Sequence, residues 1–96
     1  MFSNAILITE KDPEKIFYII NTAIRECASN HEEYVTFKFD GVEEKVIYVI
    51  EKVLKSLHYS TFICYHIYDA DKKDAKRYWY LKVSWNIFKK EREVLS

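Results

Sequence analysis

Cys64 and His66 are the residues of this sequence whose types and spacing come closest to a catalytic pair. Side chains two positions apart on a β-strand point to the same face, so both groups would lie together if this segment is a strand. A cysteine nucleophile also needs a group that orients the histidine and donors that stabilise an oxyanion. The turns that build such sites favour glycine, and the chain has a single glycine in 96 residues. We therefore expect a protein that is not an enzyme and that binds no cofactor.

A second candidate for chemistry is a group of aspartates, Asp69, Asp71 and Asp74, which resembles the opening of a calcium-binding loop. That loop pattern requires an oxygen ligand where Lys73 stands, a glycine at the turn and a glutamate that closes the loop. The sequence departs from the pattern at all of these positions. We therefore expect a solvated loop tip and no metal site.

The composition limits the classes of protein that the chain can belong to. It has 15 basic and 15 acidic residues, hence no net charge, with 49% apolar and 17% aromatic residues. Intrinsic disorder is excluded, because it requires low hydrophobicity and usually a net charge. The strongly basic balance of a dedicated duplex-DNA-binding protein is also missing. The length predicts one domain over residues 1–96, in which residues 1–10 and 87–96 are peripheral.

The cysteines and the apolar segments indicate the cellular compartment. Cys27 and Cys64 lack metal-ligand spacing and form no disulfide framework, so we expect two reduced thiols in the cytoplasm. The longest apolar region, residues 16–28, is interrupted by Asn21, Arg25 and Glu26, and nothing at the N-terminus resembles a secretory signal. We therefore expect no contact with a membrane.

Two segments carry apolar residues at helical spacing. The first begins at Asp12 and Pro13, a capping carboxylate followed by proline at the first helical position, and is predicted to run to about residue 29. The second begins after Gly41. Its predicted apolar stripe consists of Val42, Val46, Val49, Ile50, Val53, Leu54 and Leu57.

Three segments are typical of strands: residues 33–39, 61–68 and 77–85. The charged residues 69–76 predict a hairpin tip, and residues 5–9 could form an edge strand or belong to a short helix capped by Ser3. The order is therefore helix, strand, helix, strand, strand. If the last strand inserts between the other two, all pairings are antiparallel. We predict an α+β fold with a three-stranded, mainly antiparallel sheet and two helices packed on one face.

Alternation divides the predicted strands into two faces. The more apolar set is expected to meet the helices: Val35, Phe37, Phe39, Ile63, Tyr65, Ile67, Trp79, Leu81, Val83 and Trp85. The opposite set contains five aromatic residues and a cysteine, although a solvent-facing sheet surface is normally polar. Because an exposed apolar patch usually marks contact with another molecule, we predict a binding interface here. Its residues are Tyr34, Lys38, Phe62, Cys64, His66, Tyr68, Tyr78, Tyr80 and Lys82.

Three kinds of cover for this surface remain open. The chain's own ends could fold across it, with Ile6, Ile8, Ile87 and Phe88 supplying the contacts. A second copy could dock on it, most simply as a two-fold dimer, or a different protein could bind it.

Single-stranded nucleic acid is an alternative partner for the same residues, because exposed rings on an open sheet can stack bases. Only two lysines lie in this set, and the zero net charge removes most of the non-specific attraction. Charge is uneven along the chain, however: residues 1–58 have seven basic and ten acidic groups, and residues 59–96 have eight and five. We therefore expect contact with protein rather than with nucleic acid.

The layout of the chain resembles that of small α+β proteins of unknown role encoded by tailed bacteriophages. The resemblance covers residues 3–85 and rests on the segments IRECA (24–28), LKSLHY (54–59) and YLKVSW (80–85). The chain departs from the pattern at His58, where glycine is favoured. The resemblance implies a phage-like or mobile-element protein that acts by protein contact. Such a protein would serve as a virion or assembly component, or bind and inhibit a host factor.

Overall fold

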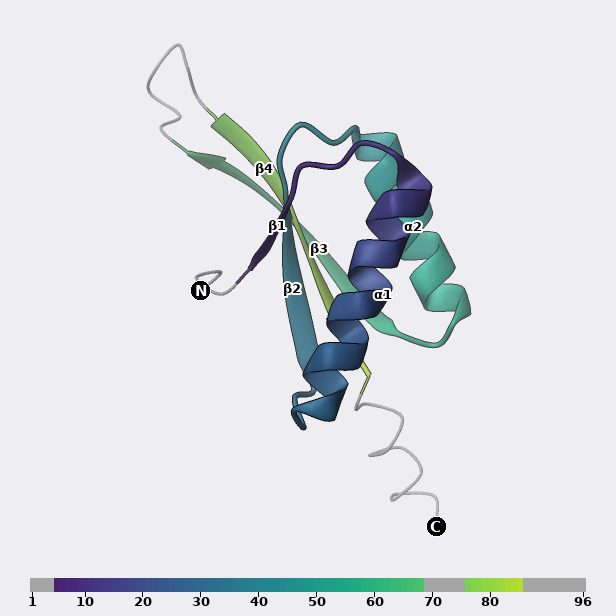
Figure 1. Cartoon of the computed structure of the whole chain (residues 1–96). Helices are drawn as coiled ribbons and strands as arrows, with labels where there is room; N and C mark the ends of the chain where they lie inside the picture. Colours follow the sequence, from purple (N-terminus) through teal and green to yellow (C-terminus); the bar gives the residue numbers. More distant parts are fainter. Residues whose placement is uncertain (1–4, 69–75, 86–96) are drawn as a thin grey trace.

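The computed structural model describes residues 5–68 and 76–85, without the side chains of residues 68, 76 and 77. The predicted α+β class is confirmed. The elements follow in the order β1 (Ile6–Ile8), α1 (Pro13–Ser29), β2 (Tyr34–Phe39), α2 (Glu44–Ser56), β3 (Ser60–Tyr68) and β4 (Lys76–Ser84). Both helices lie on the same side of the sheet (Figure 1).

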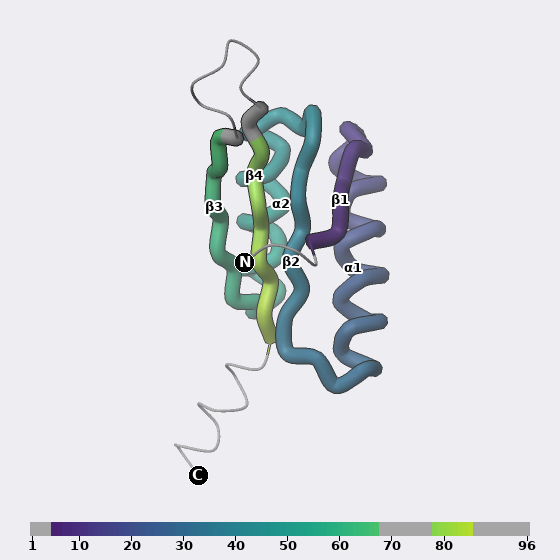
Figure 2. The backbone as a smooth tube through the Cα atoms, turned by 90° about the vertical axis from the view of Figure 1, so that its left-hand side faces the viewer, coloured from purple at the N-terminus to yellow at the C-terminus, as the bar shows by residue number. Residues whose placement is uncertain are grey.

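The sheet has four strands in the order β1-β2-β4-β3. β4 pairs antiparallel with β2 and with β3, so the last strand inserts between the two before it, as predicted. The sheet curves in front of the helix layer, with β3 and β1 at its two edges (Figure 2).

The expectation of three strands is wrong, because β1 adds a fourth. This strand pairs parallel with β2, and Ile6, Leu7 and Ile8 lie opposite Phe37, Lys38 and Phe39. Its three residues are too few for a periodic signal, which is why strand and helix could not be distinguished in this segment. Ile8 is 1% exposed and belongs to the core beneath the helices. The N-terminal segment thus extends the sheet at Ile6 and Ile8 instead of folding across it.

Helix α1 begins as the sequence predicts. The carboxylate of Asp12 accepts a hydrogen bond of 3.1 Å from the backbone N–H of Glu14, and Pro13 occupies the first helical position. Just before it, the exposed Glu10 carboxylate accepts hydrogen bonds from the backbone N–H groups of Asp12 and Lys11, which lower its pKa. The hydrogen bonds from Glu14 and Asp12 satisfy N–H groups that the start of the helix leaves without partners.

Both helices end in the same way, with a histidine in the left-handed region of backbone space. His31 follows α1 with φ +64°, and His58 follows α2 with φ +72°. After α2, the N–H of His58 donates to Lys55 and that of Tyr59 to Leu54, the hydrogen bonds of a Schellman motif. Glycine normally fills this position because it has no Cβ.

The buried stripe of α2 agrees in part with the predicted one: Ile50 and Leu54 were predicted and are buried, whereas Ile47 was not predicted. Ile47, Ile50 and Leu54 are at most 2% exposed, whereas Val49, Val53 and Leu57 are 56%, 40% and 51% exposed. The buried sector is therefore shifted around the helix from the centre of the predicted stripe toward Ile47, a shift that the spacing of apolar residues alone does not determine.

The core lies between the helix layer and the sheet and is apolar throughout its described members. From β2 and β4 it receives Val35, Phe37, Phe39, Leu81 and Val83, all members of the set expected to meet the helices. This confirms the predicted alternation for β2 and for the centre of β4. Neither of the two described helices lies on the other face of the sheet.

Candidate functional site

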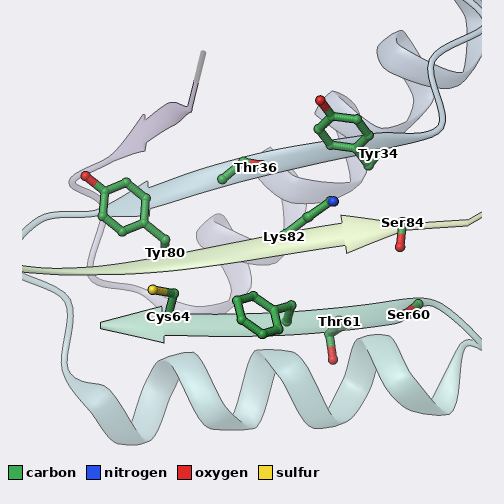
Figure 3. Close-up of a pocket in the computed structure, with 9 residues that line it drawn as sticks. Tyr34, Thr36, Ser60, Thr61, Cys64, Tyr80, Lys82 and Ser84 are labelled. Carbon is green, nitrogen blue, oxygen red and sulfur yellow. The ribbon is translucent and has the colours of Figure 1, made fainter. Parts of the chain in front are cut away.

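The face of the sheet opposite the helices, here called the open face, carries most of the residues predicted to form an interface. Paired residues in neighbouring strands share a face, and the register aligns Lys38, Tyr80 and Cys64 across three strands. Side chains from β2, β4 and β3 rise from this surface (Figure 3). The structure therefore brings the predicted residues of all three strands together. For Tyr68, one of the predicted residues, the structure describes the backbone, as part of β3, but not the side chain.

Two aromatic side chains of the open face are strongly exposed. Phe62 on β3 is 62% exposed, and Tyr34 on β2 is 54% exposed. Between them lies a shallow hollow of about 500 Å³. The described residues that line it are Tyr34, Thr36, Ser60, Thr61, Phe62, Cys64, Tyr80, Lys82 and Ser84 (Figure 3).

The two lysines of the open face lie over tyrosine rings of the neighbouring strand. The Nζ atom of Lys38 is 4.1 Å from the ring centroid of Tyr78, and that of Lys82 is 4.5 Å from the ring centroid of Tyr34. Both are diagonal contacts between β2 and β4, because Lys38 pairs with Tyr80 and Thr36 pairs with Lys82. A cation held over an aromatic face is attracted by the ring's quadrupole. The open face therefore combines aromatic rings with two ammonium groups that lie over the rings of Tyr78 and Tyr34.

Tyr80 departs from the expectation of an exposed interface residue, because it is only 2% exposed. It lies on the central strand β4, directly between Lys38 of β2 and Cys64 of β3. A side chain on a central strand has neighbours on both sides, whereas among the described strands only β4 lies beside Phe62 on the edge strand β3. Tyr80 thus contributes to the support of the open face and offers almost no area to a partner.

Cys64 and His66 both lie on the open face, as the alternation of β3 predicts, with Cys64 half-buried and His66 exposed. Within residues 5–68 and 76–85, no group of three histidine, cysteine, aspartate or glutamate side chains is arranged to hold a metal ion. The aspartates of the calcium-like pattern, residues 69–74, lie outside the described residues, as does the tail with Ile87 and Phe88.

Leu7 is an open-face residue that the sequence did not identify. It pairs with Lys38 and is 56% exposed, so it extends the apolar surface onto β1. The only signal was the apolar run at residues 5–8, which became informative once its strand pairing was known.

On the helix side, the end of β3 is less well covered than expected. Tyr65 and Ile67 belong to the set predicted to meet the helices, yet each is 41% exposed. The ring of Tyr65 packs 4.7 Å from that of Trp79, which also contacts Tyr48 of α2 at 5.9 Å. The helix layer therefore leaves part of the edge strand uncovered.

The second cysteine lies away from the open face, near the end of α1. Burial raises the pKa of the Cys27 thiol to about 11, with further contributions from its hydrogen bond to Glu32 and from the charges of Glu32 and Glu26. A thiol with a raised pKa is a poor nucleophile at neutral pH. Cys27 therefore has the properties of a structural residue.

Among the described residues, no helix is long and apolar enough to cross a membrane. Comparisons with protein-family models, with curated proteins and with solved structures found no match to this chain.

Proposed function

We propose that this chain is a non-enzymatic binding protein that docks a partner protein on the open face of its sheet. The observation that carries the proposal is the strong exposure of Phe62 and Tyr34, on a face that both helices leave uncovered. Large aromatic residues are enriched at protein interfaces, where they bury much area at low entropic cost.

The charges of the open face favour a partner with acidic groups. Lys38 and Lys82 lie on it, and no described side chain that the register places on this face is a carboxylate. If two copies stacked face to face, each would bring its lysines toward those of the other. Complementary potentials favour association and like charges oppose it. The proposed partner is therefore a different protein with an acidic and apolar surface.

This proposal is tested by placing a charge at the centre of the exposed surface. Phe62→Glu should abolish partner binding and leave the fold intact, because the Phe62 side chain is already mostly in solvent. The matched control is Tyr18→Glu, since Tyr18 is 73% exposed on α1, on the helix side of the molecule.

In the experiment, immobilised wild-type protein and both variants capture proteins from an extract of the source cells, and each candidate is then purified and titrated by calorimetry. We expect a candidate that binds the wild type and Tyr18→Glu with equal affinity and Phe62→Glu at least tenfold more weakly. The proposal fails if every purified candidate binds Phe62→Glu as tightly as the wild type, or if none binds the wild type.

Single-stranded nucleic acid is a second candidate partner, favoured by the combination of exposed rings and lysines on one face. Against it, Lys82 and Lys38 already lie over the rings of Tyr34 and Tyr78, which leaves less ring surface for base stacking. This candidate requires a labelled oligonucleotide to bind with an affinity that falls steeply with salt. The absence of binding at low salt would eliminate it.

The biological setting that we propose is the cytoplasm of a cell that harbours a phage or a mobile element. It rests on the resemblance in layout over residues 3–85. Neighbouring morphogenesis genes would favour an assembly component, and an early accessory cluster would favour a protein that binds and inhibits a host factor.

A further inference from the structure

The edge strand β3 presents a long, regular backbone edge. It pairs with β4 through nine consecutive residue pairs, from Ser60 opposite Ser84 to Tyr68 opposite Lys76, without an interruption in the register. In the described part of the sheet, no strand pairs with its other side (Figure 2). Such an edge offers a row of N–H and C=O groups on which another strand can form.

β3 also lacks the features by which proteins protect a sheet edge. Natural edges are blunted by short strands, charged side chains, proline or bulges. Residues 60–68 read STFICYHIY, without lysine, arginine, aspartate, glutamate, proline or glycine. The opposite edge strand, β1, is by contrast only three residues long.

Apolar side chains are exposed on both faces of this one strand. Phe62 is 62% exposed on the open face, while Tyr65 and Ile67 are each 41% exposed on the helix side. Because successive residues of a strand point to opposite faces, a molecule docked on one face would cover only half of this set. A strand added alongside β3 would cover both halves.

We propose that a second copy of this chain pairs antiparallel with β3 along its free edge, which joins two sheets into one of eight strands. The sequence of β3 suits pairing with itself. Cys64 is the middle of its nine residues, so a two-fold axis at Cys64 keeps every residue of the strand paired. It places Phe62 opposite His66 and Ile63 opposite Tyr65 of the second copy.

These are aromatic and apolar cross-strand pairs, which stabilise a sheet. Residues 60–68 hold no lysine, arginine, aspartate or glutamate, so no such charges lie opposite each other between the two copies of β3. The two-fold arrangement is closed, so assembly stops at two chains. The two-fold axis is perpendicular to the joined sheet, so it keeps the open faces of both copies on the same side. These two faces would form one continuous surface. The pairing does not depend on the open face having a partner of its own.

The first test is the mass of the purified full chain, measured by light scattering after size exclusion over a range of concentrations. We expect a species of twice the 11.6 kDa chain mass. A single-chain mass at every concentration overturns the proposal, and so does an assembly that grows beyond two chains. No partner protein is present, so this result is independent of the test of the open face.

Two matched double variants test the register. Phe62→Lys with His66→Lys places lysines opposite each other twice across the axis, and should reduce the dimer to monomer. Phe62→Glu with His66→Lys places two Glu–Lys pairs at the same positions and should retain the dimer. Circular dichroism verifies that both variants fold. If both are monomeric, or both dimeric, the pairing centred on Cys64 is wrong.

A short reagent that links two thiols tests independently whether the Cys64 residues of the two copies lie close together at the two-fold axis. It should couple two chains of wild-type protein and of Cys27→Ser, but not of Cys64→Ser. Coupling that survives in Cys64→Ser, or that requires Cys27, overturns the proposal.

Discussion

Along β2, Val35, Phe37 and Phe39 are at most 6% exposed, whereas Tyr34 at the start of the same strand is 54% exposed. The first three side chains point toward the helices and Tyr34 toward the open face. Both faces of the sheet are rich in apolar residues, so composition does not separate them. Burial instead follows from what lies opposite each face, and the aromatic residues of the open face lie opposite neither of the two described helices.

The largest expected effect is a difference in stability between variants of two phenylalanines, one from each face of the sheet. Phe37 is fully buried among core residues, so Phe37→Ala should lower the free energy of unfolding by about 3–5 kcal/mol through lost burial and a cavity. Phe62→Ala should cost less than about 1 kcal/mol, because its ring is mostly in solvent. Urea denaturation measures both. Equal losses would mean that Phe62 is covered in solution, as it would be in a stable dimer, so the comparison is made with monomeric protein.

Tyr80 sharpens the comparison, because it lies on the open face and yet is 2% exposed. Tyr80→Ala should lower the free energy of unfolding by about 2 kcal/mol or more, as expected for truncation of a buried side chain. Tyr34→Ala, a matched change on the same face, should have a clearly smaller effect. A small loss at Tyr80 would contradict its burial between Lys38 and Cys64.

A stabilising change is expected in the helix layer that covers the other face. His58 has φ +72°, a conformation in which a Cβ is strained, so His58→Gly should raise the free energy of unfolding by about 1 kcal/mol. His58→Ala keeps the Cβ and should show no such gain. Thermal unfolding compares the three proteins, and a loss of stability in the glycine variant would show that the histidine side chain outweighs the backbone strain.

The smallest effect concerns Cys27, whose thiol has a pKa raised to about 11. Between the ordinary thiol pKa and this value, the folded protein keeps a proton that the unfolded protein has lost. The free energy of unfolding should therefore fall slightly as the pH rises through this window, and the fall should be absent in Cys27→Ser.

The same thiol can be followed by its reactivity. In Cys64→Ser, the remaining Cys27 should react with a thiol reagent more slowly when folded than when denatured. Equal rates in the two states would contradict the raised pKa.

Much of the fold follows from local features of the sequence. Asp12 and Pro13 mark the start of α1, and the apolar period marks both helices. The alternation of Val35, Phe37 and Phe39 identifies the buried side of β2. The insertion of β4 between β2 and β3 was also expected, because it makes both of its pairings antiparallel.

The departures arise where several arrangements satisfy the same local pattern. In α2, Ile50 and Leu54 of the predicted stripe face the core together with Ile47. Val49, Val53 and Leu57 belong to the same predicted stripe and are exposed. At His58, the backbone has a positive φ, which glycine adopts without strain, and the sequence nevertheless places a histidine there.

By itself, the sequence determined the α+β class, the two helices, three of the strands and the side to which each residue of β2 points. These properties depend on the spacing of neighbouring residues and on the conformations that they favour. Only the tertiary structure decided that Ile6–Ile8 joins the sheet beside β2 and that Tyr80 is buried while Phe62 is exposed. These properties depend on contacts between distant segments, since the burial of a side chain is set by the strands and helices that pack beside it.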